Sequence, residues 1–161
     1  VPLVLEQLPE ARFVIAGTGS LEQRLKEMAR DLKVGSSVNF MGAVSHETII
    51  GLIKQASVYV SAATADGTSV ALMEAIAAGL VPVVSDIEPN RPLIAHRRDG
   101  YLFRPGDERD LSDKILMALS LGVFPQFLEK KRADSRDMIR WSSIARRFMN
   151  SYNQLTPRSG R

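Results

Sequence analysis

The sequence predicts a doubly wound α/β fold built on a mostly parallel, Rossmann-like sheet. Short, continuously apolar runs alternate with longer amphipathic segments through the first three quarters of the chain. Such alternation is typical of βαβ units, and strands without polar alternation are typical of a parallel sheet covered on both faces. The length of 161 residues suits one ordinary domain.

Five strands are expected. Each is a β-branched or aromatic run bounded by glycine or a polar residue. The expected strands are residues 12–17, 37–42, 57–62, 80–86 and 100–107. Ligands of such sheets bind at the carboxyl ends of the strands, so the loops after these runs form the candidate site.

Helices are expected between the strands, at residues 20–35, 45–56, 67–79 and 107–122. Apolar side chains at three- and four-residue spacing make the first of them amphipathic. These side chains are Leu21, Leu25, Met28, Ala29 and Leu32. Thr18 or Ser20 is expected to cap this helix. The next helix is expected to open at Ser45. The chain opens as the end of a helix running into a strand, as an excised domain would.

Composition excludes several classes of protein. There is no cysteine, which excludes disulfides and cysteine-bound metal. No apolar run approaches about 18 residues and no leader is visible, so we expect a cytoplasmic protein. Residues 128–161 carry 9 Lys and Arg against 3 Asp and Glu. This basic tail fits a solvated helix face, an anionic membrane surface or nucleic acid.

The turn Gly17-Thr18-Gly19 follows the first expected strand but is not a dinucleotide fingerprint. That fingerprint requires a third glycine, and Glu22 occupies its position. Two readings stay open for Gly17 and Gly19: a tight turn without a ligand, or a backbone that a ligand approaches closely.

A second candidate site surrounds two carboxylates, Asp66 and Glu74. Gly67, Thr68 and Ser69 are small, so a phosphate can reach the free amides of a helix that starts near Thr68. Glu74 lies within an otherwise apolar helix, where an unpaired carboxylate is costly. Its partners are either sugar hydroxyls, which pair well with a carboxylate, or a structural Arg or Lys.

The segment ADGTSVALMEAIAAGLVPVVSDIEPNR resembles the donor-binding segment of retaining glycosyltransferases with the GT-B fold, family 4 (glycosyl transferases group 1). Two acidic residues separated by seven others mark that family, and Asp66 and Glu74 have this spacing. FVIAGTG, VNFMG and RDGYLFRPGDERDLSDKI resemble the family's other segments in the same order. The similarity extends over about residues 10–152.

The resemblance implies a role for each candidate residue. Glu74 would hold the ribose hydroxyls of a UDP- or GDP-sugar, and Asp66 would be the catalytic-site acid facing the donor sugar. The remaining donor-binding residues implied are Gly17, Gly19, Met41, Gly42, Gly67, Thr68, Ser69 and Val70. No metal or other cofactor is implied, because helix amides and basic side chains would stabilise the leaving diphosphate. The two histidines, His46 and His96, are far apart in the sequence and are not expected to bind a metal.

The resemblance also implies a domain organisation. Residues 1–122 would form the nucleotide-sugar-binding domain, and residues 123–161 would form helices that pack on it and towards a missing N-terminal acceptor domain. The family's donor-clamping Arg and Lys would lie upstream of Val1. Peripheral membrane contact of the full-length protein is expected, and nucleic acid is not an expected partner. The isolated chain is expected to be inactive.

Departures from the family pattern keep alternatives open. Asp66 replaces the usual glutamate, and Pro92 stands where many relatives carry Glu. The rival functions are a sugar-nucleotide epimerase or phosphorylase on the same architecture, and a non-catalytic α/β scaffold.

Overall fold

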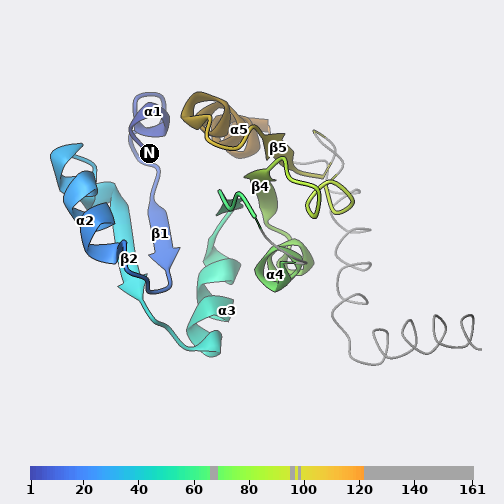
Figure 1. Ribbon diagram of the computed structural model, residues 1–161, viewed down its shortest axis with the longest axis horizontal. Helices are drawn as coiled ribbons and strands as arrows, with labels where there is room; N and C mark the ends of the chain where they lie inside the picture. The colour runs from blue at the N-terminus through green and yellow to red at the C-terminus, as the bar shows by residue number, and fades with distance from the viewer. Residues whose placement is uncertain (66–68, 95–96, 98, 122–161) are drawn as a thin grey trace, which may run out of the picture.

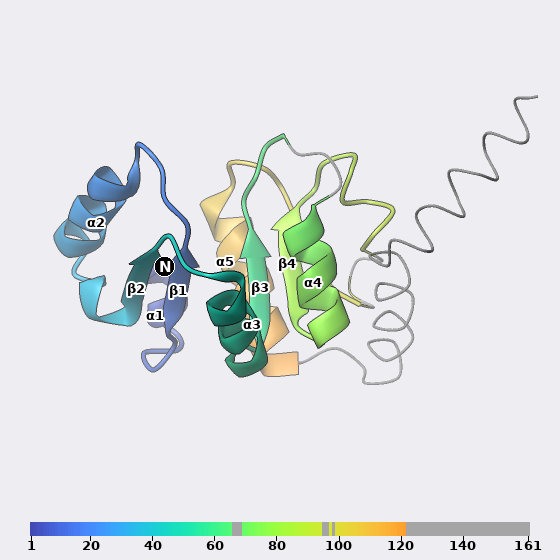
Figure 2. The same ribbon diagram turned by 90° about the horizontal axis from the view of Figure 1, so that it is seen from below.

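Helices flank the strands on both faces, and strands alternate with helices along the chain (Figure 1, Figure 2). The structure is a computed structural model that describes residues 1–65, 69–94, 97 and 99–121. The element order confirms the predicted doubly wound α/β class. The second expected unit, residues 123–161, lies outside the described residues and stays a prediction.

Five strands form at the expected places and are all paired in parallel. They are β1 (Phe13–Ala16), β2 (Val38–Gly42), β3 (Val58–Ser61), β4 (Val81–Ser85) and β5 (Tyr101–Phe103). The expectation of a single sheet is wrong for this part of the chain. β1 pairs with β2, and β3, β4 and β5 form a separate sheet in that order.

The helices also form between the expected strands. They are α1 (Pro2–Leu5), α2 (Glu22–Asp31), α3 (His46–Gln55), α4 (Val70–Ala78) and α5 (Glu108–Leu121). The helix α3 opens at Ser45 as predicted, and the structure shows that Ser45 caps it, since its side chain accepts a hydrogen bond from the Thr48 amide at 3.2 Å. The predicted cap of α2 is wrong. That helix begins one residue later than a cap at Ser20 requires, and Leu21 stands at the capping position without a side-chain hydrogen bond.

The core is centred on β4, whose five residues are all buried. Successive side chains point to opposite faces of a sheet. Val83 therefore packs with Val4 of α1 and Ile115 of α5, whereas Val84 packs with Leu72 and other residues on the α4 side. The β4 strand is thus covered on both faces, as a parallel strand requires.

The apolar stripe of α2 is largely uncovered, contrary to the expectation for an amphipathic helix. Only Ala29 is buried. The four large members remain between 41% and 58% exposed: Leu21, Leu25, Met28 and Leu32. The α2–β2 half is therefore less completely packed than the half around β4.

Candidate functional site

The loops predicted to hold a ligand lie along one edge of the structure. The connection from β1 to α2 and the described start of the connection that follows β3 both lie along the upper edge in Figure 2. Because all the strand pairs are parallel, this edge collects the carboxyl ends of neighbouring strands. The fold therefore places the candidate loops where ligands of doubly wound sheets bind.

Two of the predicted glycines meet at this edge. The Gly17 amide donates a hydrogen bond of 2.8 Å to the Gly42 carbonyl. Their φ angles are 131° and 65°, a region that side chains disfavour, so the turn itself requires glycine at both positions. An added Cβ on Gly19 would meet no heavy atom within 4 Å, so this position is open. The neighbouring Met41 is half-buried.

Helix α4 begins at Val70, three residues after the start of the predicted range 67–79 and two after Thr68. Ser69 caps it, because its Oγ accepts a hydrogen bond of 3.3 Å from the Leu72 amide. The amides of Val70 and Ala71 have no hydrogen-bond acceptor within the described part of the chain. These first-turn amides can therefore meet an anion. The candidate residues Asp66, Gly67 and Thr68 lie outside the described residues.

Glu74 is only half-buried, which corrects the expectation of a carboxylate inside the core. The buried residues of α4 are Leu72, Met73, Ala75 and Ile76, and of these Leu72 and Ile76 pack with Val84 of β4. Glu74 lies instead on the side of the helix that carries Val70, which is one helical turn earlier in the chain. Val70 is 59% exposed. Neither a hydrogen bond nor an ion pair joins Glu74 to another described residue. The predicted structural alternative, a cation locked to Glu74, is therefore not seen in this part of the chain.

A buried asparagine, which the sequence analysis missed, holds the loop after β4 in place. Asn90 is 4% exposed and donates a hydrogen bond of 2.9 Å to the Ser85 carbonyl. The Ser85 hydroxyl in turn donates to the Ser61 carbonyl at the end of β3. An asparagine shortly after a strand is the only sequence signal for this arrangement. It connects the carboxyl ends of β3 and β4.

The same loop carries a paired cation. The Arg91 Nε atom lies 2.7 Å from Asp86 Oδ1, with both side chains substantially exposed. This hydrogen bond and the charge of Asp86 raise the pKa of Arg91. The Asp86 carboxylate is thus paired with the Arg91 guanidinium at this edge of the sheet.

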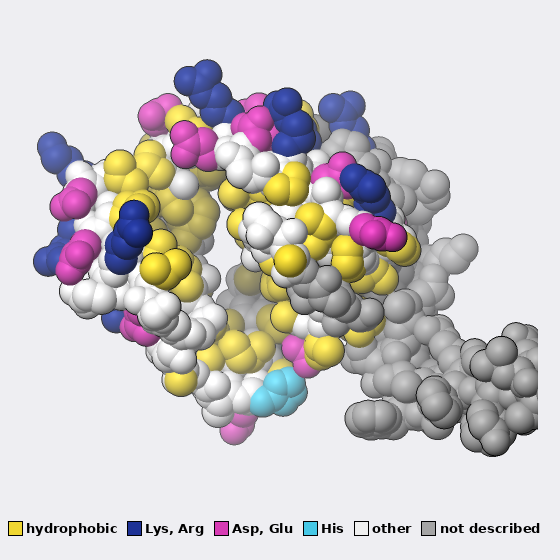
Figure 3. Space-filling view, viewed as in Figure 1, with side chains coloured by type: hydrophobic (Ala, Val, Ile, Leu, Met, Phe, Trp, Pro, Cys, Tyr) yellow, Lys and Arg dark blue, Asp and Glu magenta, His cyan; other side chains and the backbone are white. Residues whose placement is uncertain are grey.

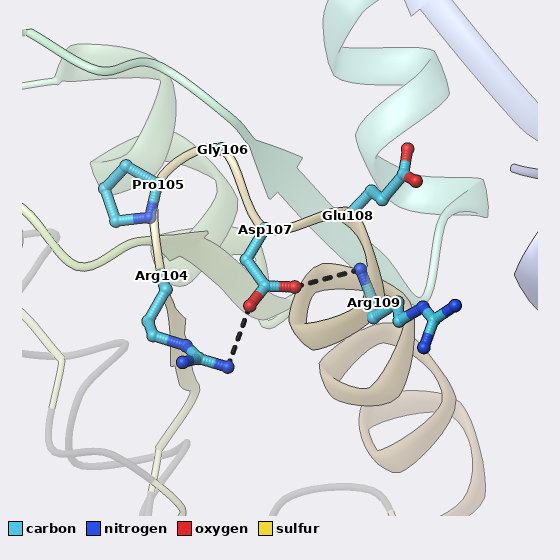
Figure 4. A pocket seen from close by; sticks show the side chains of 6 residues that line it. All are labelled: Arg104, Pro105, Gly106, Asp107, Glu108 and Arg109. Carbon is cyan, nitrogen blue, oxygen red and sulfur yellow. Dashed lines mark hydrogen bonds and ion pairs between the residues drawn. The ribbon is translucent and has the colours of Figure 1, made fainter.

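The connection from β5 to α5 encloses a shallow hollow of about 440 Å³ (Figure 4). Asp107 lies within it, pairs with Arg104 at 2.8 Å and accepts hydrogen bonds from the Arg109 and Asp110 amides. These contacts cap the first turn of α5. None of the predicted site residues lines this hollow, so we assign it to the packing of α5 and not to the donor site.

The described part of the chain shows neither a metal-binding cluster nor a membrane-spanning helix. No three His, Asp or Glu side chains in this part of the chain lie close enough together to hold a metal ion. None of the helices described combines the length and the apolar character that crossing a membrane requires.

The parallel strands, the helices on both faces and the glycine turns at one edge define a Rossmann-like α/β domain. Residues 1–136 match the family described as glycosyl transferases group 1. The chain therefore belongs to this family of glycosyltransferases, which confirms the resemblance found in the sequence.

Two relatives indicate the range of this similarity. An uncharacterized glycosyltransferase of Methanocaldococcus jannaschii is 28% identical over 162 residues, which span 100% of this chain and 41% of that protein. The GtfA subunit of a UDP-N-acetylglucosamine–peptide N-acetylglucosaminyltransferase of Streptococcus agalactiae is 31% identical, over 90% of this chain and 31% of its own length. The chain thus spans less than half the length of these relatives.

Solved structures share the fold. A glycosyltransferase from Rickettsia africae has a TM-score of 0.82 at 20% identity, over 98% of this chain and 44% of its own. The pneumococcal O-GlcNAc transferase GtfA, solved with UDP and GlcNAc, has a TM-score of 0.79 at 21% identity, over 96% and 31%. The fold is therefore that of one half of the GT-B glycosyltransferases, as the sequence predicts.

Proposed function

We propose that this chain is the donor-binding part of a retaining glycosyltransferase that takes a sugar from a UDP- or GDP-sugar. The acceptor and the rest of the active site belong to an N-terminal domain outside this chain. The proposed enzyme works in the cytoplasm, with peripheral membrane contact, and needs no metal. Positive charge and helix amides would stabilise the leaving diphosphate in place of a metal.

Family membership and the names of relatives support this choice of donor. One relative is a UDP-N-acetylglucosamine-dependent transferase, and another, from Komagataeibacter xylinus, is a GDP-mannose-dependent mannosyltransferase acting on a diphosphopolyprenol. A neighbouring structure, Anabaena HepE, was solved with UDP-glucose. A nucleoside diphosphate sugar is therefore the donor class that we assign to this chain.

The proposal depends mainly on the environment of the Glu74 carboxylate. This carboxylate is half-buried and has no partner among the described residues. It lies one turn inside a helix whose first amides have no acceptor in the described part of the chain. A carboxylate accepts two hydrogen bonds side by side, which suits the paired hydroxyls of a ribose. In the proposed complex the ribose hydroxyls are the hydrogen-bond partners of the Glu74 carboxylate, and a partly buried carboxylate without partners would be costly.

The other residues surround this contact in the proposed complex. Asp66 faces the donor sugar, and Gly67 with the amides of Thr68, Ser69 and Val70 receives the distal phosphate. We include the Ala71 amide in this set, since its N–H has no described acceptor. Gly17 and Gly19 line the diphosphate side, and Met41 and Gly42 lie near the base.

Titration calorimetry of the full-length protein with UDP-GlcNAc and GDP-mannose tests the role of Glu74. Glu74→Gln removes the charge at nearly constant volume. Losing two hydrogen bonds to a charged acceptor should weaken donor binding by about 10- to 100-fold. Glu27→Gln is the matched control, because Glu27 is an exposed carboxylate on α2. Equal affinities in the two variants would contradict the proposal.

Product analysis separates transfer from the rival functions. With an acceptor alcohol, the full-length protein should form a glycoside with retained anomeric configuration and release a nucleoside diphosphate. Asp66→Asn should lower this rate more than it weakens donor binding, since Asp66 faces the sugar. Epimerised donor, or sugar phosphate formed without an acceptor, would assign the rival enzymes. No binding of any nucleotide would assign a scaffold.

A further inference from the structure

One buried residue fixes both ends of the loop that follows β4. Asn90 is 4% exposed, and its Nδ2 atom donates a hydrogen bond of 2.9 Å to the carbonyl of Ser85, the last residue of β4. The Asn90 carbonyl accepts hydrogen bonds from the amides of Leu93 and Ile94, at 3.0 and 3.1 Å. Asn90 therefore determines where Ile94 lies relative to the end of β4.

The far end of this loop packs against α4. Ile94 is 3% exposed and forms one buried cluster with Leu72 and Ile76 of α4 and with Val84 of β4. The contact is apolar, and hydrophobic side chains are also visible beside α4 in the space-filling view (Figure 3). Because buried side chains are closely packed, a displacement of Ile94 is transmitted to Leu72.

Leu72 belongs to the first turn of α4. Its amide donates a hydrogen bond to the Oγ atom of Ser69, which caps this helix. The two preceding amides, of Val70 and Ala71, have no acceptor in the described part of the chain. Glu74 follows Leu72 by two residues. A shift of Leu72 therefore moves both the amides and the carboxylate that the proposed function assigns to the donor.

We propose that Asn90 is a positioning residue for the nucleotide-sugar donor. It holds the loop after β4 against α4 and thereby fixes the first turn of α4 in the orientation that receives the diphosphate and the ribose. Groups that bind a ligand together must be held within about 0.5 Å of the productive geometry. Asparagine suits this place, because its amide donates a hydrogen bond without bringing a charge into the interior. The identity of the ligand rests on the proposed function, whereas the contacts between Asn90, the loop and α4 do not.

Hydrogen exchange followed by mass spectrometry tests these contacts without any ligand. In the full-length protein, Asn90→Ala should raise the exchange rate of peptides covering residues 69–76 by about tenfold, since it leaves the buried end of β4 unpaired. Ser112→Ala is the matched control. Ser112 is also a buried polar residue, at 6% exposed, and it lies on α5, which packs on the other face of β4. Unchanged exchange in Asn90→Ala, or an equal rise in both variants, would overturn the proposal.

Titration calorimetry with UDP-GlcNAc and GDP-mannose tests the consequence for the site. Asn90→Ala should weaken binding of the donor by about tenfold, because misplaced binding groups lose affinity. Ile94→Val, a milder change at the far end of the loop, should act in the same direction. Ile115→Val on α5, where Ile115 is 7% exposed, is its control. Faster exchange at α4 with a donor affinity equal to that of the controls would overturn the role in the site. If the wild-type protein binds no nucleotide, the proposed function and the donor role both fail, and the exchange result alone decides whether Asn90 holds α4.

Asn90→Asp separates the hydrogen bond from the volume of the side chain. The introduced carboxyl can donate to the Ser85 carbonyl only when it is protonated. Burial raises the pKa of such a carboxyl. The donor affinity of this variant, relative to the wild-type protein, should therefore recover as the pH falls from about 8 to about 5.5. Asn90→Ala should show no recovery. A ratio for Asn90→Asp that stays constant over this range would overturn the assignment of the Asn90–Ser85 hydrogen bond as the positioning contact.

Discussion

The β4 half and the β1 half of this chain are built from the same βαβ units, yet they are packed very differently. Val83 and Val84 of β4 are fully buried, whereas Val14 of β1 is 50% exposed and Ile15 40%. Both strands are apolar and both pair in parallel. The difference lies in their neighbours. β4 has a strand on each side and a helix on each face, and β1 has a described strand on one side only.

The comparison shows that an apolar strand sequence indicates a strand suited to burial. It does not show whether neighbouring strands and helices in this chain bury it. An apolar strand is stabilised only when strands and helices remove it from water, and the stabilisation is about 25 cal/mol per Å² of apolar surface buried. In this chain that contribution is concentrated around β4. The β1 half, including α2, should therefore be the less stable half, and matched substitutions can test this.

Alanine substitutions in the two strands should give the largest contrast. Val83→Ala creates a cavity in the packed core and should lower the free energy of unfolding by about 2–4 kcal/mol. Val14→Ala removes the same atoms from an exposed position and should change it by less than about 0.5 kcal/mol. Urea unfolding of the 161-residue chain, followed by circular dichroism, measures both. Equal losses would mean that β1 is as well packed as β4.

Two glycines, Gly100 beside β4 and Gly51 in α3, differ in the space around their backbones. A Cβ on Gly100 would lie 2.6 Å from Pro82 Cγ and 2.8 Å from the Pro82 carbonyl oxygen, which belong to the buried strand β4. Gly100→Ala should therefore destabilise the chain by about 1–3 kcal/mol. On Gly51, within α3, a Cβ would meet nothing within 4 Å. Gly51→Ala should stabilise by about 0.5–1 kcal/mol.

Thermal unfolding of both glycine variants measures whether each substitution raises or lowers the stability of the chain. A stabilised Gly100→Ala variant would show that β4 and the start of β5 have room to separate. Pro82 is the second residue of β4, and the start of a strand is where a residue without an amide hydrogen is tolerated. The clash explains why the chain has glycine opposite this proline.

The sequence predicted element types well because their signals are local. Strand and helix patterns placed all five described strands and the helices between them, and Ser45 correctly marked the opening of α3. The predicted ends of the strands and helices were less accurate than their types. The strand expected to reach residue 107 ends at Phe103, since Arg104 instead donates its amide to the Asp110 carboxylate and the chain turns into α5.

Non-local features escaped prediction. No pattern within β1 reveals that its second edge lacks a described partner. The α4 sequence is apolar almost all round, so it could not show that Glu74 lies on the half-exposed side. The buried contact of Asn90 with Ser85 depends on how the chain turns after β4. The roles of Asp66, Gly67 and Thr68 remain predictions.

The Asp110 carboxylate should give the β4 half a pH-dependent contribution. Hydrogen bonds from the Arg104 amide and from Lys114 lower the pKa of Asp110. The contribution is therefore complete above the unfolded-state pKa of about 3.9 and is lost as the pH falls through the lower folded-state value. Asp110→Asn should cost about 1–2 kcal/mol at pH 7. Urea titrations from pH 7 to pH 3 should show this cost shrinking below about pH 4, and a cost that does not depend on pH would contradict the assignment.

The smallest expected effect compares two ion pairs with the same spacing. Glu22 and Lys26 on α2 lie 2.7 Å apart with side chains 30% and 42% exposed, whereas Asp110 and Lys114 on α5 lie 2.9 Å apart at 17% and 13%. Water screens the α2 pair more, so its coupling energy should be about 0.3–0.5 kcal/mol. The α5 pair should couple more strongly, because less solvent surrounds it and Asp110 also holds the Arg104 amide.

Double-mutant cycles with Glu22→Gln and Lys26→Met, and with Asp110→Asn and Lys114→Met, measure the two couplings at low and high salt. Salt should weaken the α2 coupling by the larger fraction, since screening acts mainly on exposed charges. Equal couplings with equal salt dependence would show that distance alone sets the strength of these pairs. The difference in burial between the two halves would then not extend to their charged side chains, and the contrast drawn from β4 and β1 would hold for apolar packing only.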